Sequence, residues 1–159
     1  MINIYNIKTI RKTVPIYKKI DPIQLMNWIK TFSRICNLKF TCQIITKNSD
    51  NKWLFQYKAN KEIYITLCFC DMNNDPYPYI IIDDFIFPKK YREDLLDKKI
   101  LKTIIQHVKN LDFEILIFNI KEYHQIELCK KNGFKKMNIH KMTMSLKPKF
   151  IHTYKTYNT

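Results

Sequence analysis

Alternating apolar and polar residues mark the first half of the chain as mostly extended. A period of two over about four to eight residues predicts a strand with one buried face. Turn-forming residues separate these runs, for example Asn48-Ser49-Asp50-Asn51, whose side chains favour turns. We therefore expect strands at residues 2–7, 39–46, 52–58, 62–70 and 79–87.

Helical spacing interrupts the strand pattern once in this half. Asp21-Pro22 is typical of a helix start, since Asp is a good N-cap and Pro is tolerated at the first helical position. Asn37 is the expected stop. The apolar face of this helix comprises Leu25, Trp28, Ile29, Phe32 and Cys36.

The second half of the chain is dominated by a helical period. Apolar residues between Glu93 and Asn110 predict one long amphipathic helix, and residues 113–118 predict a short buried strand. A second helix is expected over residues 122–131, because Asn132-Gly133 is a typical C-terminal stop.

A last extended segment, residues 137–146, carries a change of phase at His140-Lys141 that predicts a bulge or a tight turn.

With 159 residues, 46% of them hydrophobic, the chain fits a single domain. We place that domain at residues 1–147 and a polar tail at 148–159. No apolar run reaches the roughly 20 residues of a membrane-spanning helix, and the N-terminus lacks the apolar core of a secretory signal. We expect a soluble intracellular protein, in the cytoplasm or the nucleus, with no membrane partner.

The net charge of +14 admits two interpretations. A basic surface is typical of nucleic-acid binding. However, only three of the 28 basic residues are arginine, and the chain has one glycine, a composition that an A/T-rich coding sequence would produce.

The five cysteines favour free thiols, since Cys68 and Cys70 share one strand face without a second Cys or His pair at zinc spacing. We expect no metal.

Two short motifs make the chain resemble a known family. The stretch Asp84-Phe85-Ile86-Phe87-Pro88-Lys89-Lys90-Tyr91-Arg92 is similar to the fourth strand of the GNAT acyltransferases and its exit into the cofactor loop. Leu128-Cys129-Lys130-Lys131-Asn132-Gly133-Phe134 resembles the family's later motif that ends in Gly-Phe, and it holds the only glycine of the chain. The order of the expected elements agrees. The resemblance implies an α/β fold with a mixed, mostly antiparallel sheet flanked by helices.

The resemblance also implies acetyl-CoA as cofactor and an amine as acceptor. The family's loop reads Arg or Gln, two residues, Gly, one residue, then Gly or Ala, and it closes around the pyrophosphate at a helix N-terminus. Here the register gives Arg92-Glu93-Asp94-Leu95-Leu96-Asp97, so both small positions are lost and a carboxylate is added. The acidic residues Glu93, Asp94 and Asp97 would instead stabilise the helix dipole themselves. Backbone groups of the segment Phe85, Ile86 and Phe87 would hold the pantetheine arm.

Catalytic roles follow from the same resemblance. Asp84, next to Asp83, matches the family's general base, and Cys129 matches the tyrosine that protonates the departing thiolate, with Tyr123 as an alternative. Ordinary strand-end charges and a core cysteine explain the same residues. Lysines that could hold the phosphates of CoA surround the loop: Lys89, Lys90, Lys98, Lys99 and Lys102.

Three functions remain open on the sequence. The first is an N-acetyltransferase with a diverged cofactor loop. The second is a non-catalytic basic module that binds a protein or a nucleic acid on the same scaffold. The third is an α+β domain unrelated to the family.

Overall fold

The computed structural model describes residues 2–3, 22–47, 52–70, 78–111 and 113–146. Within them, eight strands form one sheet: β1 (Ile2–Asn3), β2 (Phe40–Lys47), β3 (Lys52–Ala59), β4 (Ile63–Cys70), β5 (Tyr79–Ile86), β6 (Ile115–Asn119), β7 (Lys135–Lys136) and β8 (Lys141–Ser145). The helices are α2 (Pro22–Cys36), α3 (Lys89–Glu93), α4 (Leu96–Lys109) and α5 (His124–Lys131). The predicted turn at 48–51, most of the predicted strand at 2–7 and the predicted tail at 148–159 lie outside the described residues.

The sheet is mixed and mostly antiparallel, as expected. Its strand order is β1-β2-β3-β4-β5-β6-β8-β7, and β5–β6 is the parallel pair. That pairing begins at Tyr79 opposite Ile115 and stops at Ile82 opposite Phe118, while β5 continues to Ile86. The second half of β5 therefore diverges from its neighbour, and this opening is where the candidate site lies.

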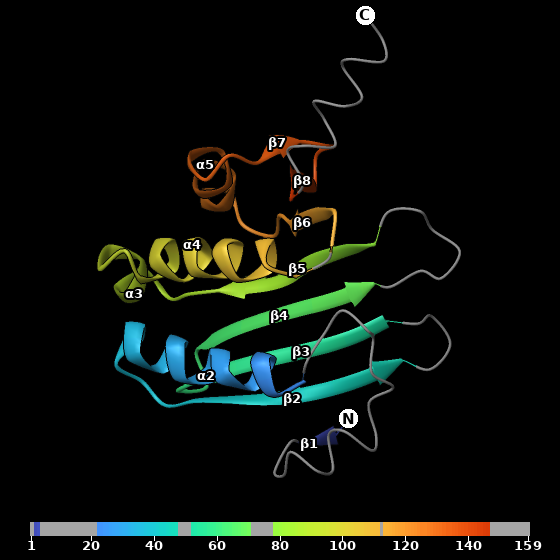
Figure 1. Cartoon of the computed structure of the whole chain (residues 1–159). Helices are drawn as coiled ribbons and strands as arrows, with labels where there is room; N and C mark the ends of the chain where they lie inside the picture. Colours follow the sequence, from blue (N-terminus) through green and yellow to red (C-terminus); the bar gives the residue numbers. More distant parts are fainter. Residues whose placement is uncertain (1, 4–21, 48–51, 71–77, 112, 147–159) are drawn as a thin grey trace, which may run out of the picture.

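Helices α2 and α4 cover the same face of the sheet (Figure 1). The ring of Trp28 on α2 lies 5.2 Å from that of His107 on α4, and the Tyr57 hydroxyl on β3 donates to the Leu25 carbonyl oxygen at 3.0 Å. The predicted apolar face of α2 is buried except for the half-buried Ile29, which confirms the helical spacing. Asn37 ends the helix with a positive φ of 52°, a backbone conformation that Asn tolerates well.

The long helix expected from Glu93 to Asn110 is broken near its start, so that prediction was wrong there. Leu95 adopts a left-handed conformation, φ 60° and ψ 24°, and its N–H donates to the Arg92 carbonyl oxygen at 3.0 Å. Helix α3 ends before this residue and α4 begins after it. Of the three acidic residues expected in one first turn, only Asp97 lies in the first turn of α4.

The predicted stop at Asn132-Gly133 is confirmed in atomic detail. Gly133 has a φ of 90°, its N–H donates to the Lys130 carbonyl oxygen, and the Phe134 N–H donates to that of Cys129. These two bonds form a Schellman motif, in which glycine is strongly favoured. The following phase change is a tight turn between β7 and β8, so the last segment is a short hairpin rather than one extended strand.

In the part of the chain that the structure describes, no helix is both long and apolar enough to cross a membrane.

Candidate functional site

The candidate site lies where β5 and β6 separate, beside the loop between α3 and α4 and the start of α5. Asp83 and Asp84 stand on the diverging part of β5. Lys121, just after β6, places its Nζ 2.6 Å from an oxygen of Asp84 and 3.9 Å from one of Asp83. The Asn119 side-chain amide donates to Asp83 at 2.8 Å. Charged and amide groups of the β6 side therefore bind both carboxylates.

Gln125, in the first turn of α5, bridges the opening between the two strands. Its side-chain Nε2 donates to the Phe85 carbonyl oxygen at 2.9 Å, and its Oε1 accepts from the backbone N–H groups of Lys121 and Glu122 at 2.8 and 3.1 Å. The residue is only 1% exposed. The Phe85 carbonyl oxygen, the one β5 group that this side chain reaches, is thus used within the protein.

The segment Phe85-Ile86-Phe87 anchors the end of β5 in the core. The two phenylalanine rings lie 4.9 Å apart, and Phe85 packs edge-on against Phe118 at 5.5 Å. Both phenylalanines are buried, while Ile86 is half-buried and pairs with Tyr64 on β4. The side chains therefore fix the end of this strand in the core, while Gln125 takes up the Phe85 carbonyl oxygen.

Asp97 occupies the N-terminus of α4, where the family's loop would receive a phosphate. The carboxylate is buried and accepts from the Lys98 backbone N–H at 2.8 Å. Burial raises the pKa of Asp97 above its usual range, and the Lys98 N–H and the nearby charges of His124 and Arg92 oppose that rise. The Arg92 Nε is buried and has no hydrogen-bond partner among the residues that the structure describes. Leu95, by contrast, is 55% exposed and does not fill the loop.

The raised pKa of Asp97 predicts how stability depends on pH. The folded state holds the Asp97 proton more tightly than the unfolded chain, so ionisation costs stability at neutral pH and the cost disappears as pH falls below both pKa values. We expect Asp97→Asn, which keeps the acceptor oxygen, to raise the melting temperature at pH 7 and to leave it unchanged in acid. Thermal unfolding across pH measures this.

Asp94→Asn is the control for that prediction, because Asp94 lies in the same loop and is exposed. It should change stability by less than about 0.5 kcal/mol. A lower melting temperature for Asp97→Asn at pH 7 would contradict the prediction. It would mean that attraction to the helix dipole and to Arg92 outweighs desolvation.

Cys129 and Tyr123, the two candidates for a catalytic acid, differ sharply in exposure. Cys129 on α5 is 0% exposed, and burial raises the pKa of its thiol to about 12. Tyr123 precedes the helix and is almost fully exposed. Neither lies among the side chains that the structure gathers around Asp84, so both roles stay predictions.

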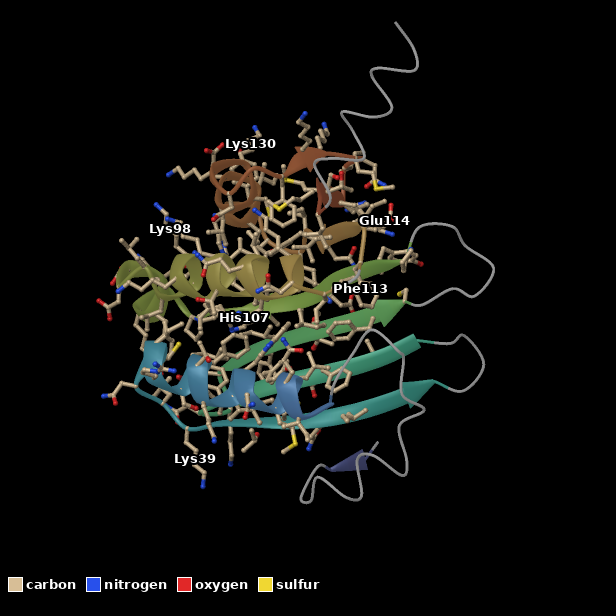
Figure 2. All side chains as sticks on the ribbon, in the orientation of Figure 1. Lys39, Lys98, His107, Phe113, Glu114 and Lys130 are labelled. Carbon is tan, nitrogen blue, oxygen red and sulfur yellow. The ribbon has the colours of Figure 1, made fainter. Side chains whose placement is uncertain are left out.

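The lysines around the loop are largely exposed. Lys90 pairs with Glu62 at 3.0 Å and Lys89 lies 3.9 Å from Glu93. Figure 2 shows Lys98 near the N-terminal end of α4. Two of the predicted phosphate-binding lysines, Lys89 and Lys90, thus contact different carboxylates of the chain.

Three residues of the site were missed by sequence reasoning: Asn119, Lys121 and Gln125. A signal existed for the first two, because polar groups after a parallel strand gather at the carboxyl edge of a sheet. No sequence pattern indicated a role for Gln125, since a single glutamine in a short amphipathic helix is usually solvated. Among the described residues, no three His, Cys, Asp or Glu side chains are grouped so that they could hold a metal ion.

No protein-family model matches the chain, and no curated protein matches it. Among solved structures, it is similar to a GNAT family acetyltransferase from Elizabethkingia anophelis with acetyl-CoA bound, at 15% identity and a TM-score of 0.45 over 67% of this chain and 97% of that one. It is similar to a GNAT family acetyltransferase from Staphylococcus aureus Mu50 at 14% and 0.43, over 81% and 97%. A chain of the NatC complex bound to Gag peptide and CoA gives 11% and 0.47, over 89% and 88%.

The chain has a diverged GNAT-like fold. Its mixed, mostly antiparallel sheet flanked by helices is the architecture that the resemblance implies. At the positions to which the resemblance assigns phosphate and pantetheine, the Asp97 carboxylate accepts from the Lys98 N–H and the Gln125 amide donates to the Phe85 carbonyl oxygen.

Proposed function

We propose that this protein is a non-catalytic GNAT-like binding protein whose cofactor cleft is closed by its own side chains and whose basic surface binds a polyanionic partner. The observation that carries the proposal is the 2.9 Å bond from Gln125 Nε2 to the Phe85 carbonyl oxygen. The resemblance to the GNAT acyltransferases implies that backbone groups of this segment hold the pantetheine arm by hydrogen bonds. Here a buried amide already satisfies one of them, and displacing it would leave its own buried polar atoms unpaired.

Electrostatics at the loop support the same proposal. A phosphate approaching the N-terminus of α4 would meet the Asp97 carboxylate, which already accepts from the Lys98 N–H. At about 4 Å, two like charges near a protein surface repel by about 4 kcal/mol. The helix dipole is thus satisfied from within the chain.

The candidate catalytic groups also favour a binding role. The Lys121 ammonium lies 2.6 Å from one oxygen of Asp84 and ties up that oxygen. The thiol of Cys129 is fully buried. Lys121 competes with any amine for Asp84, which lowers the usefulness of that carboxylate as a base.

Acetyl transfer from acetyl-CoA to an amine is the second candidate, and two observations favour it. Leu95 keeps the left-handed backbone that a small residue would adopt in this loop, although this costs a leucine roughly 1–2 kcal/mol. The unpartnered Nε of Arg92 is a donor that a phosphate could satisfy. In this function, Asp84 would take the proton of the amine and Lys121 would have to move away.

The deciding experiment is thermal unfolding of the full chain with acetyl-CoA at about 1 mM, with coenzyme A alone as control. We expect no change in melting temperature. A ligand present at 100 times its dissociation constant would add about 2.7 kcal/mol of stability, which is several degrees for a chain of this size. A shift of that size would overturn the proposal in favour of acetyl transfer, and an amine screen with Asp84→Asn as the inactive control would follow.

A further inference from the structure

The outer edge of the sheet carries a surface that the cleft does not explain. We call it the basic hairpin: Lys130 and Lys131 at the end of α5, Lys135 and Lys136 on β7, the turn 137–140, and Lys141 on β8. Figure 1 shows α5, β7 and β8 together at the end of the molecule, and β7 is the edge strand. In Figure 2, Lys130 projects outward there.

The charge of the basic hairpin is of one sign. Residues 128–146 include five lysines and no acidic residue. Within the described part of the chain, the structure pairs one of these lysines: Lys130 lies 4.0 Å from Glu127, and both side chains are exposed. Exposed pairs of this kind contribute little, so the surface keeps a strongly positive potential.

Two aliphatic side chains stand exposed at the tip of this hairpin. Met137 is 59% and Ile139 77% exposed. The backbone beneath them is fixed, because the Met137 and Asn138 N–H groups both donate to the Lys141 carbonyl oxygen, at 3.0 and 3.2 Å. The Ile120 N–H binds the His140 carbonyl oxygen at 2.7 Å. The apolar groups are thus presented on an ordered turn.

Protection of the sheet edge explains only part of this arrangement. Lysines on an edge strand prevent pairing with other chains, which accounts for Lys135 and Lys136. It does not account for aliphatic groups that are exposed at the tip, since these would promote association. A second copy of the chain is a poor partner for the tip, because five lysines would face five lysines.

We propose that the basic hairpin binds the surface of an anionic membrane, with Met137 and Ile139 inserted at the boundary of the acyl chains and the lysines against the headgroups. Interfacial binding combines buried aliphatic area with attraction of Lys to anionic lipid. The segment 128–141 has no arginine, Tyr or Trp, and its Phe134 is buried, so His140 is its one exposed ring that could stack on single-stranded RNA. Lysine point charges with aliphatic tips therefore fit a lipid surface better. The protein would lie on the membrane and not cross it.

This inference deepens the proposed function by naming the polyanion, but it is tested independently of the cleft. The experiment is co-sedimentation of the full chain with vesicles of phosphatidylcholine alone or with about 30% phosphatidylserine. We expect affinity for the anionic vesicles to be at least about tenfold higher, and to fall as salt is raised. The melting temperature of each variant below confirms that it is folded.

Two variants and one control locate the binding surface. Met137→Asp with Ile139→Asp, and separately Lys135→Glu with Lys136→Glu, should each lose about tenfold or more in affinity. Lys30→Glu with Lys39→Glu changes the net charge as much as the Lys135 and Lys136 variant does, also at exposed sites, and Figure 2 places Lys39 at the opposite end of the molecule from Lys130. It should stay within about threefold of the wild type.

Three outcomes would overturn the inference: equal binding to both vesicle types, an equal loss in the control, or hairpin-dependent binding to oligouridine in place of vesicles. A shift with acetyl-CoA would instead reject the closed cleft and leave the membrane surface standing.

Discussion

Replacing Gln125 by alanine is expected to lower the free energy of unfolding by about 2–4 kcal/mol, because three backbone groups lose their hydrogen-bond partner at once. The Phe85 carbonyl oxygen loses its donor, and the N–H groups of Lys121 and Glu122 lose their acceptor. The last two lie near the surface, where water can replace the amide. The Phe85 carbonyl oxygen belongs to a buried residue and is covered by the buried Gln125, so most of the lost stability should arise from this group. Chemical denaturation at pH 7 measures it.

The matched control is Gln56→Ala on β3. Gln56 is half-buried and makes one long bond, 3.4 Å from its Nε2 to the Thr66 hydroxyl oxygen. Its loss should cost less than about 1 kcal/mol. A Gln125→Ala variant no less stable than this control would show that the bridge across the strands is incidental. The proposal of a closed cleft would then lose the observation that carries it.

The sequence predicted most elements of this fold because their apolar spacing is strong. The four long strands and the helices at 22–36 and 124–131 lie within about two residues of the expected bounds. The break at Leu95 was missed for a physical reason: a single left-handed residue leaves the helical spacing of Leu96, Ile100 and Leu101 intact. Apolar periodicity indicates which side chains face the core. It does not reveal a change in the backbone conformation of a single residue.

The candidate site was predicted less completely than the fold. Motif resemblance proposed Asp84, Arg92 and Cys129 as site residues, but it could not reveal what their side chains contact. The closing contacts come from Lys121 and Gln125, which lie about 40 residues away in sequence from their partners on β5. Such long-range polar pairs depend on the exact placement of α5, which no local pattern encodes.

Replacing Phe118 by alanine should have the largest effect, a loss of about 3–5 kcal/mol. Phe118 is fully buried at the last position of β6 that pairs with β5, next to the point where β5 diverges. Its ring packs edge-on against Phe85 at 5.5 Å and Phe134 at 6.0 Å, and so joins three elements of the site. Alanine would leave a cavity among rigid strands that cannot collapse to fill it. The melting temperature should fall by roughly 10 °C.

Ile139→Ala is the control for the stability measurement, and it also tests the proposed membrane surface. It also removes aliphatic area, but from a side chain that is 77% exposed, so stability should change by less than about 0.5 kcal/mol. If Phe118→Ala unfolds easily while Ile139→Ala keeps full stability and loses vesicle binding, the two apolar residues have separate roles: one stabilises the divergence of the strands, and the other binds a partner. A large loss of stability in Ile139→Ala would show that the tip is packed, and the membrane surface would have to be abandoned.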